Sequence, residues 1–179
     1  MSQKLAYVTG GMGGIGTAIC QRLHKEGFKV IAGCGPTRDH VKWVGEQAAL
    51  GYTFYASAGN VGAWDSTVEA FTKTKAEHGS IDVLVNNAGI TKDRMFLKMT
   101  REDWDGVIET NLNSMFNVTK QVVADMWKKA GAASSTFRLS TAKKARPGKP
   151  ITQRPRPACT ASPWRWRKKW PPRASLSTP

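Results

Sequence analysis

The sequence feature that most constrains the fold is a run of glycines between a short apolar strand pattern and a helical pattern. Thr9 is followed there by Gly10-Gly11-Met12-Gly13-Gly14-Ile15-Gly16. Glycines let the main chain turn tightly and approach a ligand closely, and the N-terminus of the next helix offers unpaired N–H groups to an anion. A glycine-rich turn alone is weak evidence, but between a strand and a helix it predicts a binding site for the pyrophosphate of a dinucleotide.

Strand and helix patterns alternate from the first residues to about Met126. Apolar strand runs are expected at 4–9, 28–32, 52–57 and 81–85, and helical spacing at 14–26, 41–50, 65–78 and 100–126. Asp65 or Ser66 is the expected cap of the third helix, and Thr100 with Asp103 is the expected capping pair of the fourth. This alternation predicts βαβ units, and so an α/β fold with a parallel sheet and right-handed crossovers.

The composition changes abruptly near Met126. Residues 1–126 contain 13 basic and 13 acidic side chains, whereas residues 127–179 contain 14 basic side chains, no acidic one and eight of the nine prolines. A packed domain rarely has the second composition. We therefore expect a dinucleotide-binding part at 1–126 and a basic, disordered tail at 127–179.

The cysteines and the apolar runs restrict the setting. Cys20, Cys34 and Cys159 have no metal-ligand spacing, so no metal site is expected, and the first two lie in apolar stretches typical of core positions. The chain opens directly on a strand pattern and has no apolar run of membrane length. These features favour a cytoplasmic protein without a membrane partner.

The glycine spacing resembles the Thr-Gly-x-x-x-Gly-Ile-Gly motif of the short-chain dehydrogenase/reductase family. Further matches follow in order: Asn60-Val61 after the third strand, Asn86-Asn87-Ala88-Gly89 after the fourth, and Asn111 in the next helix. A lone asparagine is more often a cap or turn residue, but four matches in order make coincidence a poor explanation. The resemblance implies a Rossmann-type doubly wound sheet whose first strands lie in the order 3-2-1-4.

The same resemblance implies roles for individual residues. Asn111 would be the family's catalytic asparagine, which holds a water relay. The end of the second strand lacks the acidic residue that NAD enzymes have there, and Arg38 can pair with a 2′-phosphate. We therefore expect NADP rather than NAD as the cofactor. Alternatively, Arg38 is a solvated loop residue. The expected cofactor-binding residues are Gly10, Met12, Gly13, Gly14, Ile15, Gly16, Gly35, Arg38, Asn60, Val61, Asn87, Ala88 and Gly89.

Two phrases, 6–16 and 86–93, resemble the branch of the family that reduces acetoacetyl-CoA with NADPH during polyhydroxybutyrate synthesis. In that branch the residues matching Asp93 and Lys98 lie beside the acyl-CoA substrate, and Lys98 can attract its phosphates. Lys98 is equally well explained as a surface lysine. The resemblance also implies a homotetramer.

The proton-transfer residues of the family are missing. The family uses a serine, a tyrosine and a lysine four residues after the tyrosine, whose pKa is depressed by the lysine. This chain has only Tyr7, Tyr52 and Tyr55, and no lysine stands four residues after any of them. The chain as written is therefore predicted to be inactive.

A shifted reading frame explains the missing residues. Permitted codons for residues 127–137, regrouped after one added base, encode Val-Glu-Lys-Gly-Trp-Gly-Arg-Ile-Ile-Asn-Ile, which resembles the family's fifth strand. The codons of residues 149–156, regrouped in the same way, encode Gln-Thr-Asn-Tyr-Ser-Thr-Ala-Lys, which contains the missing tyrosine and lysine. The tyrosine codon spans the codons of Ile151 and Thr152, and the lysine codon spans those of Pro155 and Arg156. The missing serine codon spans those of Arg138 and Leu139. We predict a base lost near the Met126 codon, by mutation or by sequencing error.

Two other interpretations remain open. The segment 164–170 alternates tryptophan with arginine and lysine, which suits nucleic-acid or anionic-membrane binding, although its charge alone also gives non-specific attraction to nucleic acid. Alternatively, the chain is a non-catalytic fragment that binds NADP. That fragment would expose an apolar strand at 81–85 as an open, aggregation-prone sheet edge.

Overall fold

The computed structural model describes residues 3–130, in which strands and helices alternate. The order is β1 (Leu5–Val8), α1 (Gly14–Lys25), β2 (Lys29–Cys34), α2 (His40–Ala49), β3 (Phe54–Ala58), α3 (Trp64–His78) and β4 (Val83–Val85). After β4 follow the 3-10 turn η1 (Phe96–Lys98), α4 (Arg101–Ile108), the π-helical turn η2 (Glu109–Asn113) and α5 (Ser114–Ala130). The residues from 131 onward, for which we expect disorder and a shifted reading frame, lie outside the described residues.

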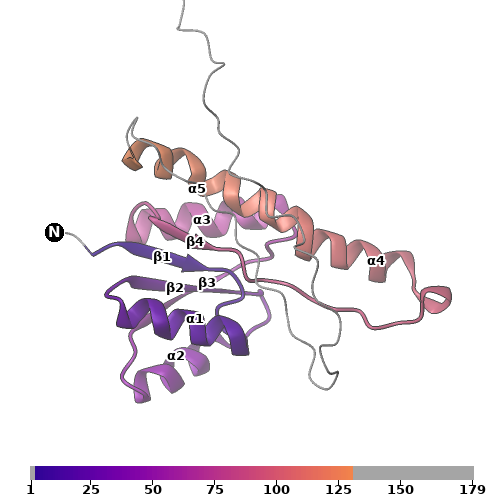
Figure 1. Cartoon of the computed structure of the whole chain (residues 1–179), viewed down its shortest axis with the longest axis horizontal. Coiled ribbons are helices and arrows are strands. Elements are labelled where there is room, and N and C mark those ends of the chain that lie inside the picture. The colour runs from indigo at the N-terminus through magenta and orange to yellow at the C-terminus, as the bar shows by residue number, and fades with distance from the viewer. Residues whose placement is uncertain (1–2, 131–179) are drawn as a thin grey trace, which may run out of the picture. The chain divides into compact units, whose positions relative to one another are not determined.

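The four strands form one parallel sheet in the order β3-β2-β1-β4 (Figure 1). Tyr7 in the central strand β1 is paired with Ile31 in β2 and with Leu84 in β4. The prediction of an α/β, doubly wound sheet of Rossmann type with strand order 3-2-1-4 is confirmed. All four carboxyl ends lie at one edge of the sheet, where open α/β folds bind their ligands.

One face of the sheet is covered by α1 and α2 (Figure 1). Its core contains Val8, Val30 and Phe54 from three strands, packed against Cys20 from α1 and Trp43 from α2, which stacks on Phe54. Alternate positions of each strand point to this face, as strand geometry requires.

The other face is covered by α3 and α5, which also contact each other (Figure 1). Tyr7 and Ile31 point from the strands into this core and meet Phe71 of α3 and Val118 and Val122 of α5. Because both faces are covered, the strands are apolar at nearly every position, as expected for a buried parallel sheet.

Among the element boundaries that differ from the sequence prediction, two have a clear physical cause. β2 continues through Gly33 to Cys34, because these residues pair with Ser57 and Ala58 of β3. The glycine does not end the strand; it makes room for the ring of Tyr7, which a Cβ atom at Gly33 would approach to 2.9 Å. α3 begins at Trp64 after Ala63, without a capping side chain, so the expected cap by Asp65 or Ser66 is wrong. Ser66 instead accepts a hydrogen bond from the N–H of Asn60 (2.9 Å).

The long final helix is not regular. The expected cap is present, because Thr100 Oγ1 accepts a hydrogen bond from the N–H of Asp103 (3.2 Å). The helix then widens into the π-turn η2 before continuing as α5 to Ala130, four residues past Met126. Within residues 3–130 no helix is both long and apolar enough to cross a membrane.

Candidate functional site

The site is built on the junction between the ends of β1 and β4. Thr9 is buried, and its Oγ1 accepts hydrogen bonds from the N–H groups of Asn87 (2.9 Å) and Ala88 (3.0 Å). Its own N–H donates to the carbonyl of Val85 (3.0 Å). One threonine therefore holds the chain that leaves β4 beside the start of the glycine turn.

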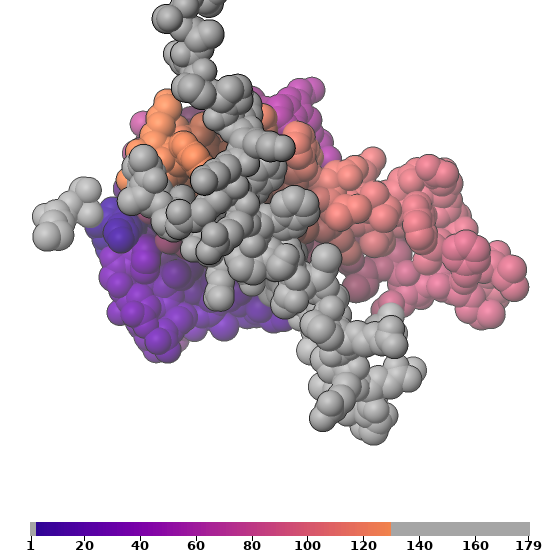
Figure 2. All heavy atoms as spheres, turned by 45° about the horizontal axis from the view of Figure 1, so that its top comes forward, coloured from indigo at the N-terminus to yellow at the C-terminus, as the bar shows by residue number. Residues whose placement is uncertain are grey.

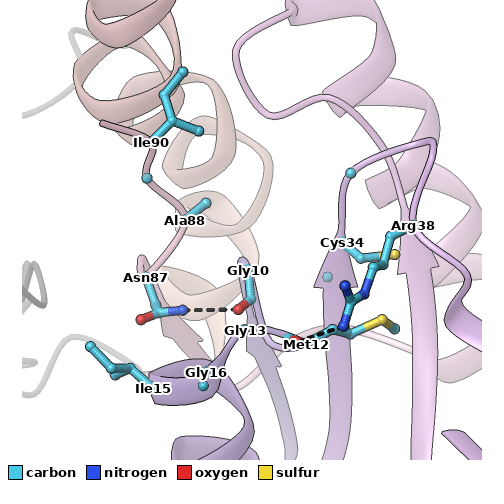
Figure 3. A pocket seen from close by; sticks show the side chains of 14 residues that line it. Gly10, Met12, Gly13, Ile15, Gly16, Cys34, Arg38, Asn87, Ala88 and Ile90 are labelled. Carbon is cyan, nitrogen blue, oxygen red and sulfur yellow. Dashed lines mark hydrogen bonds between the residues drawn. The ribbon is translucent and has the colours of Figure 1, made fainter. Parts of the chain in front are cut away.

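The side chain of Asn87 also stabilises the junction between the ends of β1 and β4. Its side-chain amide donates to the carbonyl oxygens of Thr9 and Gly10, at 3.0 Å each, and the bond to Gly10 is drawn in Figure 3. Gly10 has a φ of 61°, in the left-handed region, and a Cβ atom there would lie 3.0 Å from the Cα of Ala88. The turn therefore needs a glycine at this position for both its conformation and its close approach.

We expect Thr9→Val to destabilise the protein by about 1–3 kcal/mol, because the part-buried N–H groups of Asn87 and Ala88 lose their acceptor while the side-chain shape is retained. Urea denaturation followed by circular dichroism measures the change. Thr53→Val, at an exposed position, is the matched control and should change the free energy of unfolding little. Equal stability of the two variants would contradict the proposed importance of the Thr9 hydroxyl.

The turn then leads into the N-terminus of α1. Gly13 is the N-cap, no side chain caps this end of the helix, and its first turn contains no acidic residue. The N–H groups and the dipole of the helix therefore favour an anion at this point.

A cleft with a volume of about 460 Å³ opens in front of this helix end (Figure 3). The glycine turn forms its floor, the end of β2 one wall, and the chain after β4 the other. Eleven of the expected cofactor-binding residues line it: Gly10, Met12, Gly13, Gly14, Ile15, Gly16, Gly35, Arg38, Asn87, Ala88 and Gly89. Gly33, Cys34 and Ile90 also line it and were not predicted.

A second hollow of about 310 Å³ shares the residues at the ends of β1, β2 and β4 with the first. It is lined in addition by the two other expected residues, Asn60 and Val61. The side-chain oxygen of Asn60 accepts a hydrogen bond from the N–H of Gly62 (3.0 Å), so it shapes the turn after β3. Buried Asn117 of α5 donates to the carbonyls of Val61 (3.1 Å) and Gly62 (3.2 Å) and fixes the same turn.

Arg38 is the only charged residue among those that line either hollow in the described part of the chain. Its Nη2 lies 3.4 Å from the carbonyl oxygen of Met12, across the mouth of the cleft (Figure 3). The next carboxylate, Asp39, caps α2 by accepting a hydrogen bond from the N–H of Lys42 (3.0 Å). The end of β2 therefore presents a cation to the cleft.

Cys34 lies beside Arg38 at the wall of the cleft and is buried, as is Cys20 in the core; both were expected at core positions. Burial raises the pKa of the Cys34 thiol, although the nearby guanidinium of Arg38 acts in the opposite direction. Cys34 is thus a neutral wall residue. Within residues 3–130 no cluster of three or more histidine, cysteine or acidic side chains is placed to hold a metal ion.

Asn111 lies in the π-turn η2 and binds the chain after β4 rather than lining the cleft. Its Oδ1 accepts a hydrogen bond from the N–H of Ile90 (2.8 Å), and its Nδ2 donates to the carbonyl of Ile90 (2.9 Å). Single π-turns inside α-helices are frequent at functional sites. Here the turn also brings Thr110 to the second hollow, a position that sequence analysis missed.

Asp93 and Lys98 are not brought into the cleft. Both are exposed, Asp93 in the segment before η1 and Lys98 at the end of η1. Figure 2 shows this part of the chain projecting from the body of the molecule.

The three tyrosines do not replace the missing proton donor. Tyr7 lies in the core against Phe71, and burial raises its pKa to about 12, opposite to the direction that acid catalysis needs. Tyr52 packs on Phe54, and Tyr55 lies beside His78 with the ammonium of Lys29 over its ring, so neither lines the cleft.

Comparisons with known proteins agree with this geometry. Residues 4–134 match the family model for short chain dehydrogenase. The acetoacetyl-CoA reductase of Cupriavidus necator is 65% identical over 127 residues, which is 70% of this chain and 52% of the relative. Nodulation protein G of Azospirillum brasilense is 52% identical over 127 residues, which is again 70% of this chain and 52% of the relative.

The solved structure of a Serratia marcescens short-chain dehydrogenase/reductase mutant is similar, with a TM-score of 0.62 and 27% identity. The match covers 69% of this chain and 51% of that one. The present chain thus spans about half the length of the relatives it matches.

Proposed function

The chain belongs to the short-chain dehydrogenase family, and from this premise we propose that its cleft binds a nicotinamide dinucleotide. We further propose that the complete protein, in one reading frame, reduces acetoacetyl-CoA to 3-hydroxybutyryl-CoA. The observation that carries this proposal is the 65% identity to an acetoacetyl-CoA reductase over 127 residues, which are 70% of this chain and about half of the relative.

The residues present fit a dinucleotide. The uncapped N-terminus of α1 offers N–H groups to the pyrophosphate, and a Cβ atom at Gly10 or Gly16 would obstruct the turn that forms this surface. The hollow beside Asn60 and Val61 suits the adenine, and the wall formed by Asn87–Ile90 suits the nicotinamide ribose. When bound, the nicotinamide supplies the hydride.

We propose NADP rather than NAD because Arg38 faces the cleft and Asp39 is occupied as a helix cap. Arg38→Ala should weaken NADPH binding about tenfold, the loss expected for one charge-assisted hydrogen bond, while NADH binding changes little. Fluorescence titration of both nucleotides measures this difference.

Arg22→Ala is the matched control for Arg38→Ala. Arg22 is an exposed arginine at the far end of α1, paired with Glu26. If Arg38→Ala weakened both nucleotides equally, Arg38 would not select the 2′-phosphate.

The substrate half of the site is a further part of the proposal. Asp93 and Lys98 would face the acyl-CoA, and Asn111 would hold the water relay at the π-turn η2. Serine, tyrosine and lysine would come from the corrected frame after Met126. We place the complete enzyme in the cytoplasm as a homotetramer and attribute any nucleic-acid binding to the charge of the tail.

The decisive experiment has a genetic and a biochemical part. Sequencing the coding DNA across the Met126 codon shows whether a base is missing. The frame-corrected protein is then assayed with acetoacetyl-CoA and with longer 3-oxoacyl-CoA substrates, with NADPH or NADH, by the loss of nucleotide absorbance. Reduction of acetoacetyl-CoA with NADPH supports the proposal, and a corrected protein that binds neither nucleotide would overturn it.

A further inference from the structure

The segment between β4 and α4 has little packing of its own. Its side chains are strongly exposed, with Met95 at 66%, Phe96 at 79% and Leu97 at 92%. Figures 1 and 2 both show this region projecting beyond the sheet. Its position must therefore be fixed by a few specific contacts rather than by a core.

The first contact is the pair of hydrogen bonds between Asn111 and Ile90 described above. The second is Asp103, in the first turn of α4, whose side chain is only 9% exposed. Its Oδ1 lies 3.4 Å from Nζ of Lys92, and its Oδ2 lies 3.2 Å from Nη1 of Arg94. One carboxylate thus reaches the residue on each side of Asp93.

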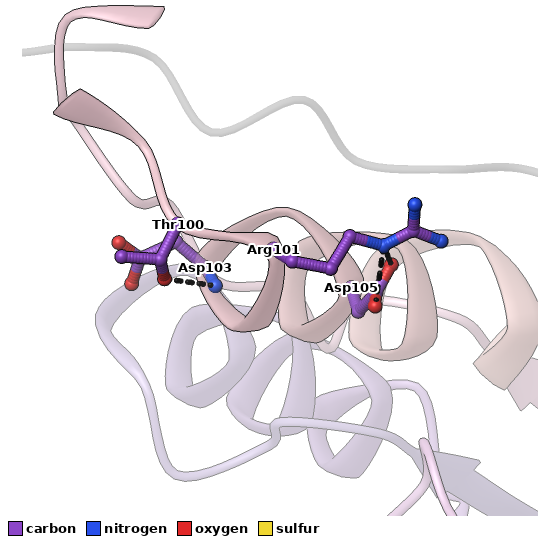
Figure 4. A network of polar contacts seen from close by, with 4 residues as sticks. All are labelled: Thr100, Arg101, Asp103 and Asp105. Carbon is purple, nitrogen blue, oxygen red and sulfur yellow. Dashed lines mark hydrogen bonds and ion pairs between the residues drawn. The ribbon is translucent and has the colours of Figure 1, made fainter. Parts of the chain in front are cut away.

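Asp103 is also fixed in orientation by its own helix. Its N–H donates to Thr100 Oγ1, the N-cap of α4 (Figure 4). Burial alone would raise the pKa of Asp103, but Arg94, Lys92 and the N–H of Thr100 outweigh it and hold the pKa below its ordinary value. The carboxylate is therefore charged at neutral pH. Within the described residues its buried Oδ2 accepts no hydrogen bond, so its contact with Arg94 is an ion pair only.

Asp105, two residues further along the helix, provides a contrast. It forms an exposed pair with Arg101 within α4, at 2.8 Å (Figure 4). Such a pair joins a helix only to itself and, being exposed to solvent, contributes little to stability. Asp103 instead joins α4 to a different segment of the chain.

We propose that Asp103 is a positioning residue that, together with Asn111, sets the orientation of residues 90–98 toward the substrate. The inference rests on the proposed function, because it assigns Asp93 and Lys98 to the acyl-CoA side of the site. Asp103 does not touch the substrate; it holds Lys92 and Arg94, and so the backbone of Asp93 between them. Loss of the Asp103 carboxylate removes the ion-pair partner of Lys92 and Arg94 and so loosens the segment 90–98. The hydrogen bond from the Asp103 N–H to Thr100 Oγ1 remains.

The test uses the frame-corrected enzyme with Asp103→Asn, Asp103→Glu and the control Asp105→Asn. We expect Asp103→Asn to raise the KM for acetoacetyl-CoA about fivefold or more, with kcat and the KM for NADPH changed less than about twofold. Asp103→Glu should recover part of the loss, and Asp105→Asn should behave as the unchanged enzyme. Hydrogen exchange of the amides at 91–95, also measured in the 179-residue chain, should speed up about tenfold in Asp103→Asn.

The outcomes separate the inference from the proposed function. If the corrected enzyme is active and Asp103→Asn leaves the KM for acetoacetyl-CoA unchanged, the inference is wrong and the function stands. If the corrected enzyme does not reduce acetoacetyl-CoA, the function fails, and unchanged exchange at 91–95 would then also refute the anchoring role of Asp103. If Asp105→Asn raised the KM for acetoacetyl-CoA as much as Asp103→Asn, loss of any carboxylate on α4 would explain the effect, and the specific role of Asp103 would be refuted.

Discussion

Gly16→Ala is expected to lose most of the stability of the domain and all measurable NADPH binding. A Cβ atom at this position falls on the carbonyl oxygen of Gly10 and within 2.8 Å of the Cα of Gly11. Both obstacles are main-chain atoms of the turn, so no side-chain rotation relieves the contact. We expect a loss of about 3 kcal/mol or more, the upper part of the range for overpacked sites.

Urea denaturation and NADPH fluorescence titration measure the two effects. Gly45→Ala is the matched control, because Gly45 lies inside helix α2 and has no atom within 4 Å of an added Cβ. That variant should gain about 0.5–1 kcal/mol from the better helix propensity of alanine. Wild-type stability and binding in Gly16→Ala would mean that the turn differs from the one described.

The second large effect concerns turnover. The 179-residue chain should show no reduction of acetoacetyl-CoA above background, and in the frame-corrected protein the proton donor alone should raise the rate by roughly 10²- to 10⁴-fold. The physical reason is that Tyr7 lies in the core with its pKa raised to about 12, while Tyr52 and Tyr55 lie outside the cleft. We therefore expect none of the three tyrosines to give the carbonyl its proton.

Initial rates with NADPH at equal protein concentration measure this difference. A corrected protein whose restored tyrosine is changed to phenylalanine is the control, and it should fall back toward the 179-residue chain while still binding nucleotide. Substantial turnover by the 179-residue chain itself would refute the prediction that it is inactive.

Much of the fold followed from local patterns that physical rules interpret directly. The alternation of strands and helices predicted a parallel sheet, and the strand–glycine–helix order at Thr9–Gly16 predicted a dinucleotide site. The structure places thirteen predicted residues around two adjoining hollows at the carboxyl ends of the strands. The cap at Thr100 was also predictable, because a threonine and an acidic residue three positions later form a local motif.

What could not be predicted depends on contacts between distant segments. Gly33 continues a strand because the ring of Tyr7 lies against it, and a strand-breaking residue gives no sign of that neighbour. The π-turn at Glu109–Asn113 follows no sequence motif, so the approach of Thr110 to the second hollow was missed. Asp103 could be recognised as a capping residue, but its pairing with Lys92 and Arg94 requires the path of the segment between β4 and α4.

The central place of β1 in the sheet has a consequence for how the domain assembles. Val8 pairs with Ala32, 24 positions away, but also with Val85, 77 positions away, and the hydroxyl of Thr9 reaches Asn87 across a similar span. Closing the longer loop costs more chain entropy, and pairings of high contact order form late. We therefore expect β4 to be the last of the four described strands to dock and the nucleotide pocket to be completed with it, so NADPH binding should appear late in refolding.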